Sequence, residues 1–397
     1  MDLQSSPQGV VAGSIPLFAG HPAHELLPIS TVRTLVDSIW SGPDVVRLFN
    51  YGDEQGNRQL IDFLAARHQQ CENLNIGREH LMIIGGSTWG VGMITHHLAG
   101  PGDTVLVDAP SYRDALHIFR DAKLDLQAIA IDDGGVIVDE MERRLRDLAS
   151  VRRRPKFYYV VPNFQNPTGI TLARERRQAI VDLSKEYGFV IVEDDVYRDI
   201  RFVDDLPPSF YALSRGENVL RLGTFSKTLA PGLRIGWLIG PAETVKRFVT
   251  SGMLRMGGGA NPFAAAIVAD FCSSGRWEEH VARLRNQYKL RRDCALAALD
   301  AVMPDSARWT RPEGGYFIWL QLPDYVTVDE LEGQAQAENV YFASGKGFFV
   351  HPEDGAHHLR LSFSYVPLDD LRSGIATLGR IIKGARRSHR SRRSRRH

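Results

Sequence analysis

The sequence predicts an α/β fold, with a large domain built on a mostly parallel seven-stranded sheet flanked by helices and a smaller α+β domain beside it. Three observations predict it. Between residues 55 and 260, short apolar runs alternate with longer amphipathic segments, as in chains that form helix-covered parallel sheets. After about residue 275, a long amphipathic pattern is followed by isolated strand-like runs. The length of 397 residues also exceeds what a single hydrophobic core usually serves.

The predicted strands of the large domain are short and rich in Val, Ile and aromatic residues, as buried strands are. Between them lie helical patterns such as 174–187, for which Thr171 is the expected N-cap and Gly188 the expected end. Sheets of this kind bind ligands at the carboxyl ends of their strands, so we expect the functional residues there. The predicted strands are Leu81–Ile84, Thr104–Val107, Leu126–Ile131, Phe157–Val161, Phe189–Val192, Val219–Leu222 and Ile235–Ile239.

The domain boundaries follow from the same pattern. Residues 50–275 form the predicted large domain, and residues 1–49 with 276–385 form an N-terminal arm and the small domain. Residues 386–397 contain only Arg, Ser and His, which cannot build a core, so we expect a disordered basic tail. In the small domain we expect helices Trp277–Leu299 and Leu368–Ile382 and strands Tyr316–Leu320 and His358–Phe363.

Composition excludes several classes of function. The formal net charge is +1, and without the seven arginines of the tail it is −6, so the body of the protein has no charge that favours a polyanionic partner. The basic tail could bind nucleic acid, but a solvated tail is the commoner meaning of such a run, so we do not expect a nucleic-acid partner. The three cysteines are widely spaced, which disfavours a disulfide framework or a metal site and fits a reducing compartment. We expect no membrane segment, because no run of about 18 apolar residues occurs, and a cytoplasmic location.

The strongest chemical signal is the run from Thr224 to Trp237, directly after a predicted strand. Lys227 follows two hydroxyl residues, and Arg234 comes seven positions later. An amine can hold an aldehyde cofactor and move protons, while the hydroxyls of Thr224 and Ser226 and a guanidinium can bind a phosphate. A lone lysine in such a place is more often a surface residue beside a turn, but the whole run favours a cofactor site.

Two further motifs follow neighbouring predicted strands. The run from Asn163 to Gly169 follows one strand, and the acidic run from Glu193 to Tyr197 follows the next. Each has an ordinary alternative, a simple turn for the first and a solvated acidic loop for the second. Three motifs at the ends of three predicted strands favour a single shared site.

In this order, the three motifs resemble those of the class I and II aminotransferases, which use pyridoxal 5'-phosphate and have pyridoxal-phosphate fold type I. The resemblance spans residues 13 to 384 and is greatest to the subgroup with aminoadipate and kynurenine aminotransferases. It implies that Lys227 holds the cofactor as a Schiff base and shuttles the catalytic proton. It also implies that Asp194 pairs with the pyridine nitrogen, and that Asn166 and Tyr197 bond the phenolic oxygen.

Other segments resemble the family as well. Ser87 and Thr88 match its phosphate loop, where backbone N–H groups at a helix start bind the anion. Tyr112 matches the residue that stacks on the cofactor ring. Tyr51 matches the residue that reaches the phosphate of the neighbouring subunit, which implies a homodimer with shared active sites. Arg360 matches the arginine that forks onto the substrate α-carboxylate, a role that suits a guanidinium.

The resemblance implies an aminotransferase that moves the amino group of an L-amino acid to a 2-oxo acid, with 2-oxoglutarate as the expected acceptor. Gly20 and Asn166 are expected beside the substrate, and His21 stands where relatives carry a second small residue. A lyase or cyclase with the same site is the first alternative. The second is a ligand-sensing domain of a regulator; such regulators carry an N-terminal helix-turn-helix module, and here the resemblance already begins at residue 13.

Overall fold

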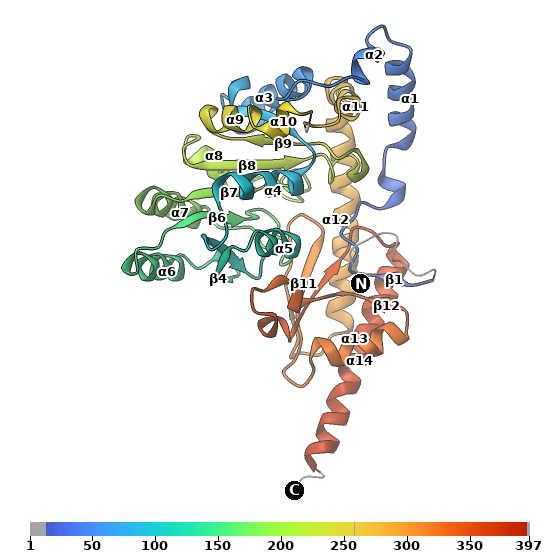
Figure 1. Ribbon diagram of the computed structural model, residues 1–397. Helices are drawn as coiled ribbons and strands as arrows, with labels where there is room; N and C mark the ends of the chain where they lie inside the picture. The colour runs from blue at the N-terminus through green and yellow to red at the C-terminus, as the bar shows by residue number, and fades with distance from the viewer. Residues whose placement is uncertain (1–12, 258, 395–397) are drawn as a thin grey trace.

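The computed structural model describes residues 13–257 and 259–394 and has the two-domain α/β architecture (Figure 1). The main sheet has eight strands in the order β2-β9-β8-β7-β6-β3-β4-β5, and all seven predicted strands are present. The pairings from β4 through β3, β6 and β7 to β8 are parallel, whereas β9 pairs antiparallel with both β8 and β2. The strands are β2 Leu81–Ile84, β3 Thr104–Ala109, β4 Asp125–Asp132, β5 Gly135–Val136, β6 Pro155–Val160, β7 Val190–Asp194, β8 Val219–Thr224 and β9 Gly236–Ile239.

The predicted number of seven strands is wrong by one. The extra strand, β5, has two residues and pairs antiparallel with the end of β4. A two-residue strand leaves no alternating pattern, so its sequence carries no signal that periodicity could detect.

Helices cover both faces of the sheet, and successive side chains of each strand enter opposite cores. Met82 and Ile84 belong to a core that also holds side chains of α4, α5 and α9, whereas Leu81 and Ile83 belong to a core with side chains of α3, α6, α7 and α11. This two-faced burial explains why the strands read as continuous apolar runs. The helices of the large domain are α3 Arg58–Glu72, α4 Ser87–Leu98, α5 Arg113–Asp121, α6 Val138–Ser150, α7 Arg174–Tyr187, α8 Phe210–Leu213, α9 Ala242–Val249, α10 Gly252–Arg255 and α11 Pro262–Ser273.

Helix α7 has the predicted bounds, and Gly188 ends it in the left-handed conformation. The predicted N-cap is wrong. Ala173 occupies the cap position without a side-chain hydrogen bond, while the Thr171 hydroxyl accepts from the Phe164 backbone N–H at 3.4 Å. Thr171 therefore stabilises the preceding loop, which belongs to the site described below.

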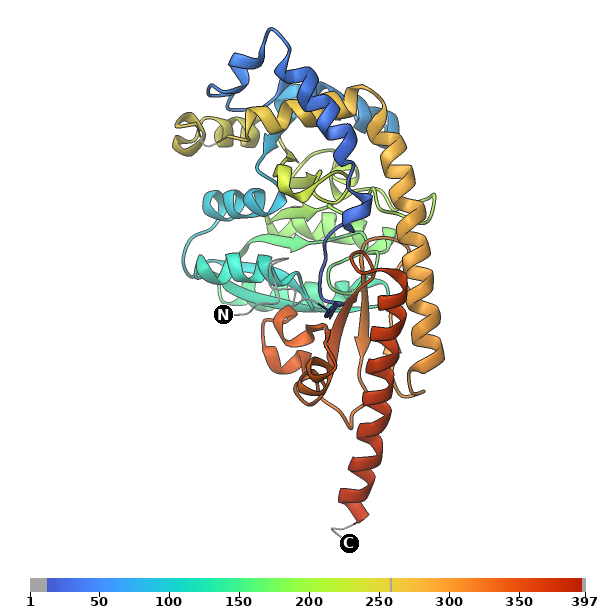
Figure 2. The same cartoon turned by 90° about the vertical axis from the view of Figure 1, so that its right-hand side faces the viewer.

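The small domain is a four-stranded antiparallel sheet, ordered β10-β11-β14-β13, with helices on one side. The long helix α12 runs beside both domains, and the arm passes along it to pair β1 with β12 (Figure 2). These elements are β1 Ile15–Pro16, α1 Ile29–Trp40, α2 Val45–Leu48, α12 Arg276–Val302, β10 Arg308–Trp309, β11 Phe317–Gln321, α13 Val328–Ala337, β12 Val340–Tyr341, β13 Ala343–Ser344, β14 His358–Ser362 and α14 Leu368–Ser394, with the short 3-10 helices His24–Leu26, Arg78–His80, Pro231–Leu233, Gly345–Phe348 and Pro352–Gly355.

Helix α14 passes the predicted end at Ile382 and continues to Ser394, so the backbone of 386–394 is helical where the sequence predicts disorder. Arg has a high helix propensity, and a helix that has already formed extends at little cost. The remainder of the predicted tail, 395–397, lies outside the described residues. Within the described part of the chain, no helix is long and apolar enough to cross a membrane.

Candidate active site

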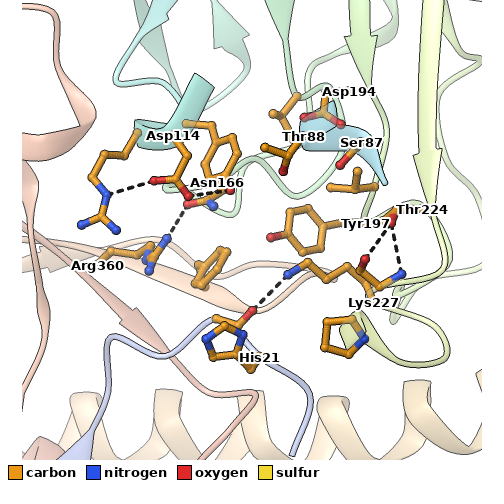
Figure 3. Close-up of a pocket in the computed structure, with 18 of the residues that line it drawn as sticks. His21, Ser87, Thr88, Asp114, Asn166, Asp194, Tyr197, Thr224, Lys227 and Arg360 are labelled. Atoms are coloured by element: carbon orange, nitrogen blue, oxygen red, sulfur yellow. Dashed lines mark hydrogen bonds and ion pairs between the residues drawn. The ribbon is translucent and has the colours of Figure 1, made fainter. Parts of the chain in front are cut away.

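A cavity of about 230 Å³ lies where the carboxyl ends of β6, β7 and β8 face the small domain and the arm. Every predicted site residue except Tyr51 lines it (Figure 3). These residues come from segments as distant as Gly20 and Arg360, so the fold, and not proximity in sequence, brings them together.

Lys227 lies just beyond the end of β8, and its side chain enters the centre of the cavity. Its Nζ donates to the backbone carbonyl of Gly20 at 3.0 Å and lies 5.8 and 5.5 Å from the ring centroids of Tyr197 and Tyr316. The Tyr316 hydroxyl fixes the backbone by donating to the Lys227 carbonyl at 2.9 Å. Burial, with the charge of Arg360, lowers the pKa of the amine to about 8, so a larger fraction is neutral and nucleophilic near neutral pH than in an ordinary lysine.

Asp194 ends β7 with a carboxylate that is only half satisfied. Its Oδ2 accepts from the Tyr159 hydroxyl at 2.6 Å, while Oδ1 is buried and has no hydrogen-bond partner among the described residues. Burial raises the pKa of Asp194 to about 6, opposed by the Tyr159 hydrogen bond and by the charge of Lys227. A buried anionic oxygen without a partner is costly, so this site fits a ligand that offers a cationic N–H.

The neighbouring Asp195 faces away from the cavity into a buried ion network. Its carboxylate accepts from Asn163 at 2.5 Å and from Arg221 at 2.8 Å, and Arg221 also binds Glu72. The acidic run is therefore buried, not a solvated loop, and its two aspartates have different partners. Asp194 is the one that lines the cavity.

One corner of the cavity gathers hydroxyl groups and a guanidinium around the start of helix α4. The Thr224 and Ser226 hydroxyls lie 3.0 Å apart, and Arg234 Nη1 donates to Ser226 at 3.4 Å. Gly86 caps α4 without a side-chain hydrogen bond and has φ +90°; a Cβ there would lie 2.5 Å from Arg234 Nη2. Free N–H groups, hydroxyls and a cation at a helix N-terminus fit a phosphate. Ser87 and Thr88 begin the same helix.

Arg360 enters the cavity from β14 on the opposite side. Its Nη1 donates to Asn166 Oδ1 at 2.7 Å and its Nη2 donates to the Phe18 carbonyl at 2.8 Å. The Nε is buried and has no acceptor among the described residues, and the guanidinium carbon lies 4.0 Å from the Phe317 ring centroid. Burial lowers the pKa of Arg360 only to about 10, so it remains a cation at neutral pH.

The sequence interpretation missed several residues of the cavity. Arg113 and Asp114 directly follow the predicted Tyr112 and also line the cavity, so their position next to Tyr112 was an available signal. Phe18 and Phe348 come from the arm and the small domain, and nothing in their local sequence distinguishes them from core aromatics. Tyr159, the partner of Asp194, lies within a strand and reads as a core residue.

Two predicted residues need separate mention. At Gly20 a Cβ would lie 2.7 Å from the Phe317 ring, so the close approach of the arm to the cavity requires glycine. Tyr51 lies outside this cavity, with 84% of its surface exposed, beside Phe49 and Gly257 at a separate hollow.

Comparison with known proteins decides the family. The family model described as aminotransferase class I and II matches residues 43–378. The chain belongs to the class I and II aminotransferases. It has 32% identity over 93% of its length to aromatic-amino-acid aminotransferase 1 of Thermococcus litoralis, of which it covers 88%. This aminotransferase is an enzyme that uses pyridoxal phosphate to transfer amino groups.

The similarity extends to the fold and to a second kind of protein. The kynurenine aminotransferase of Pyrococcus horikoshii, solved with PMP, has a TM-score of 0.89 at 33% identity, over 94% of this chain and 92% of that one. An uncharacterized HTH-type transcriptional regulator of Bacillus subtilis, YdfD, is 29% identical over 93% of this chain and 74% of its own length.

Proposed function

We propose that this aminotransferase moves the amino group of an L-amino acid with a neutral or aromatic side chain to 2-oxoglutarate. The observation that carries the proposal is that Lys227 and Arg360 line one cavity, together with an Asp194 oxygen that has no hydrogen-bond partner among the described residues. The Phe18 and Phe348 rings line the substrate side, which supports an apolar donor side chain. The names of the relatives, for aromatic amino acids and kynurenine, support the same class.

The residues around the sheet edge fit the parts of pyridoxal phosphate one by one. Asp194 Oδ1 would hold the protonated ring nitrogen, and Asn166 and Tyr197 the phenolic oxygen. Tyr112 would cover the ring. The phosphate would lie in the corner formed by Thr224, Ser226 and Arg234. The start of α4, with Ser87 and Thr88, completes this corner. When bound, the cofactor supplies an electron sink that stabilises negative charge at the substrate Cα.

Lys227 has two tasks in this proposal. It anchors the cofactor through its Nζ. Once displaced, it serves as the general base that removes the substrate Cα proton and delivers it to the C4′ carbon of the cofactor. The lowered pKa of Lys227 keeps the released amine partly neutral at physiological pH, as a base requires. The Gly20 carbonyl, which accepts from Nζ at 3.0 Å, would orient it toward the substrate side.

Arg360 and Asn166 would fix the substrate. Arg360 offers planar donors for the α-carboxylate, and Asn166 already binds one edge of that guanidinium at 2.7 Å. Fixing the carboxylate restricts rotation of the substrate about its Cα, which favours cleavage of the Cα–H bond over loss of the carboxylate.

We also propose a homodimer with shared active sites, in the cytoplasm. The exposed Trp40, Phe49 and Tyr51 belong to one region, where Trp40 and Phe49 pack edge to face at a centroid distance of 5.6 Å. Such a cluster of exposed aromatic side chains supports contact with a second copy. The three cysteines are free, which supports a reducing compartment.

A half-reaction tests the reaction type. Holoenzyme mixed with a good donor and no acceptor should release one equivalent of oxo acid per active site and convert the cofactor to its amino form. Continuous product formation without acceptor would contradict the proposal and favour the lyase or cyclase alternative. Absence of turnover with every amino acid, together with unchanged cofactor absorbance, would favour the ligand-sensing alternative that the regulator relative represents.

A further inference from the structure

The cavity holds an arginine that the proposed function leaves without a role. Arg113 is the first residue of helix α5 and lines the same cavity as Lys227 and Arg360, with 21% of its side chain exposed. Of the four Lys and Arg residues in the cavity lining, Lys227 is the anchor, Arg234 belongs to the phosphate corner, and Arg360 faces the α-carboxylate. Arg113 is therefore the remaining cation.

Contacts from both domains orient the Arg113 side chain. Its Nε donates to Asp114 Oδ1 at 3.3 Å, and the other oxygen of Asp114 accepts from the Tyr112 hydroxyl at 2.8 Å. On the small-domain side its stem lies over Gly347, where an added Cβ would be 2.9 Å from Arg113 Cδ. The 3-10 helix Gly345–Phe348, which contains Gly347, is held near the start of α5 because the Ser111 N–H donates to the Phe348 carbonyl at 2.8 Å.

The terminal nitrogens of Arg113 remain available. Within the described part of the chain, Arg113 donates one side-chain hydrogen bond, from Nε to Asp114, and its Nη1 and Nη2 have no acceptor there. A guanidinium held by one edge offers its remaining N–H groups in a plane that matches a carboxylate. The Asp114 carboxylate is itself bound, by the cationic Arg113 at one oxygen and by the neutral Tyr112 hydroxyl at the other.

We propose that Arg113 binds the distal carboxylate of a dicarboxylic substrate while Arg360 holds the α-carboxylate, which makes Arg113 the residue that selects 2-oxoglutarate over monocarboxylic oxo acids. This inference rests on the proposed transamination. Asp114 acts as a positioning residue, since it holds the Nε edge. Neutral and aromatic donors would use the same α-carboxylate site and place their side chains on the Phe18 and Phe348 rings, leaving the Arg113 nitrogens to water.

The test uses holoenzyme and two acceptors of equal chain length, 2-oxoglutarate and 2-oxopentanoate, which differ only in the distal carboxylate. The measured quantity is the ratio of their kcat/KM values. In Arg113→Gln we expect this ratio to fall on the order of tenfold, the range of one lost charge-assisted hydrogen bond. The exposed Arg247→Gln on helix α9 is the matched control and should keep the wild-type ratio. Where turnover is too slow, inhibition constants of glutarate and pentanoate give the same ratio.

A second variant separates the position of the Arg113 guanidinium from its charge. Gly347→Ala keeps the cation but pushes the Arg113 stem, so the ratio should fall in the same direction, whereas Gly333→Ala, where a Cβ has open space, should not change it. A ratio in Arg113→Gln within about twofold of wild type, well below the effect of one hydrogen bond, would overturn the inference. If wild-type enzyme transfers no amino group to either acceptor, the proposed function itself fails, and the two failures are thus distinct.

Discussion

The two sides of the cavity are built in different ways. On the sheet side, Asp194 and Thr224 end strands β7 and β8 and Ser226 follows β8, so a parallel sheet sets their positions. On the other side, Phe18, Arg113 and the small-domain residues come from an arm, a helix start and a separate sheet. The sheet side can be complete before a substrate arrives, whereas the other side depends on how the two domains meet.

The two sides also differ in which buried polar atoms lack a hydrogen-bond partner. Among the described residues, a carboxylate oxygen on the sheet side, Asp194 Oδ1, and a donor on the substrate side, Arg360 Nε, are buried without a hydrogen-bond partner. An unpaired anionic oxygen fits a cationic ring nitrogen, and an unpaired cationic N–H fits a carboxylate. In the proposed assignment, a carboxylate faces the ring nitrogen of the cofactor and a guanidinium faces the carboxylate of the substrate, while the hydroxyls and Arg234 would hold the phosphate. The following predictions test this division.

The largest expected effect is that of Lys227→Ala, because it removes both the anchor and the base. Turnover should fall by roughly 10⁴-fold or more, the upper range for a positioned acid–base group. The variant should also lose the cofactor absorbance of the linked form. Borohydride trapping of a cofactor adduct in this variant would mean that another lysine carries it.

Asp194→Asn should have the next largest effect. The amide keeps the Tyr159 hydrogen bond but cannot balance a positive ring nitrogen, so Cα proton removal should slow by about 10²-fold. Single-turnover kinetics measure this step. A loss of less than about tenfold, or 1.4 kcal/mol, would contradict the assignment of Asp194.

The sequence predicted residues on both sides of the cavity, Arg360 and Gly20 included, but on the substrate side it missed Arg113, Phe18 and Phe348. Lys227, Asp194 and Asn166 could be located because each lies at or a few residues beyond the end of a buried strand, which the periodic pattern predicts, and because the motifs around them resemble those of the family. For Arg113 the neighbouring Tyr112 was the available signal, and for Phe348 there was none, because the small domain approaches α5 through a contact between segments distant in sequence. The eighth strand and the helical 386–394 were missed because two residues carry no period and an Arg-rich segment carries no core.

Arg360→Lys tests the substrate side. An ammonium retains the charge but loses the planar fork and the two contacts to Asn166 and Phe18. KM for the amino acid should rise by about tenfold, with a smaller change in kcat, because the lost interaction binds substrate in every state. Steady-state kinetics with one donor at saturating 2-oxoglutarate measure both. An unchanged KM would remove Arg360 from the substrate site.

A smaller effect is expected from pH. The folded-state pKa of Lys227 is lowered to about 8, so the neutral, nucleophilic amine becomes more abundant as pH rises toward that value and nearly complete above it. The rate at which cofactor-free enzyme captures pyridoxal phosphate should therefore rise up to about tenfold per unit below pH 8 and level off above it. Stopped-flow absorbance measures the rate. A rise that continues to pH 10 would mean that the amine keeps its ordinary pKa.

The division of labour across the cavity is tested most directly by measuring cofactor affinity and amino-acid KM in the same two variants, Ser226→Ala and Arg360→Lys. Ser226 accepts from Arg234 in the phosphate corner, so Ser226→Ala should raise the Kd for pyridoxal phosphate by about fivefold, roughly one hydrogen bond, and leave KM near wild type. Arg360→Lys should raise the KM for the amino acid and leave the Kd for pyridoxal phosphate near wild type. If both constants move together in both variants, the cofactor and substrate sides are not separate, and the proposed division between them is contradicted.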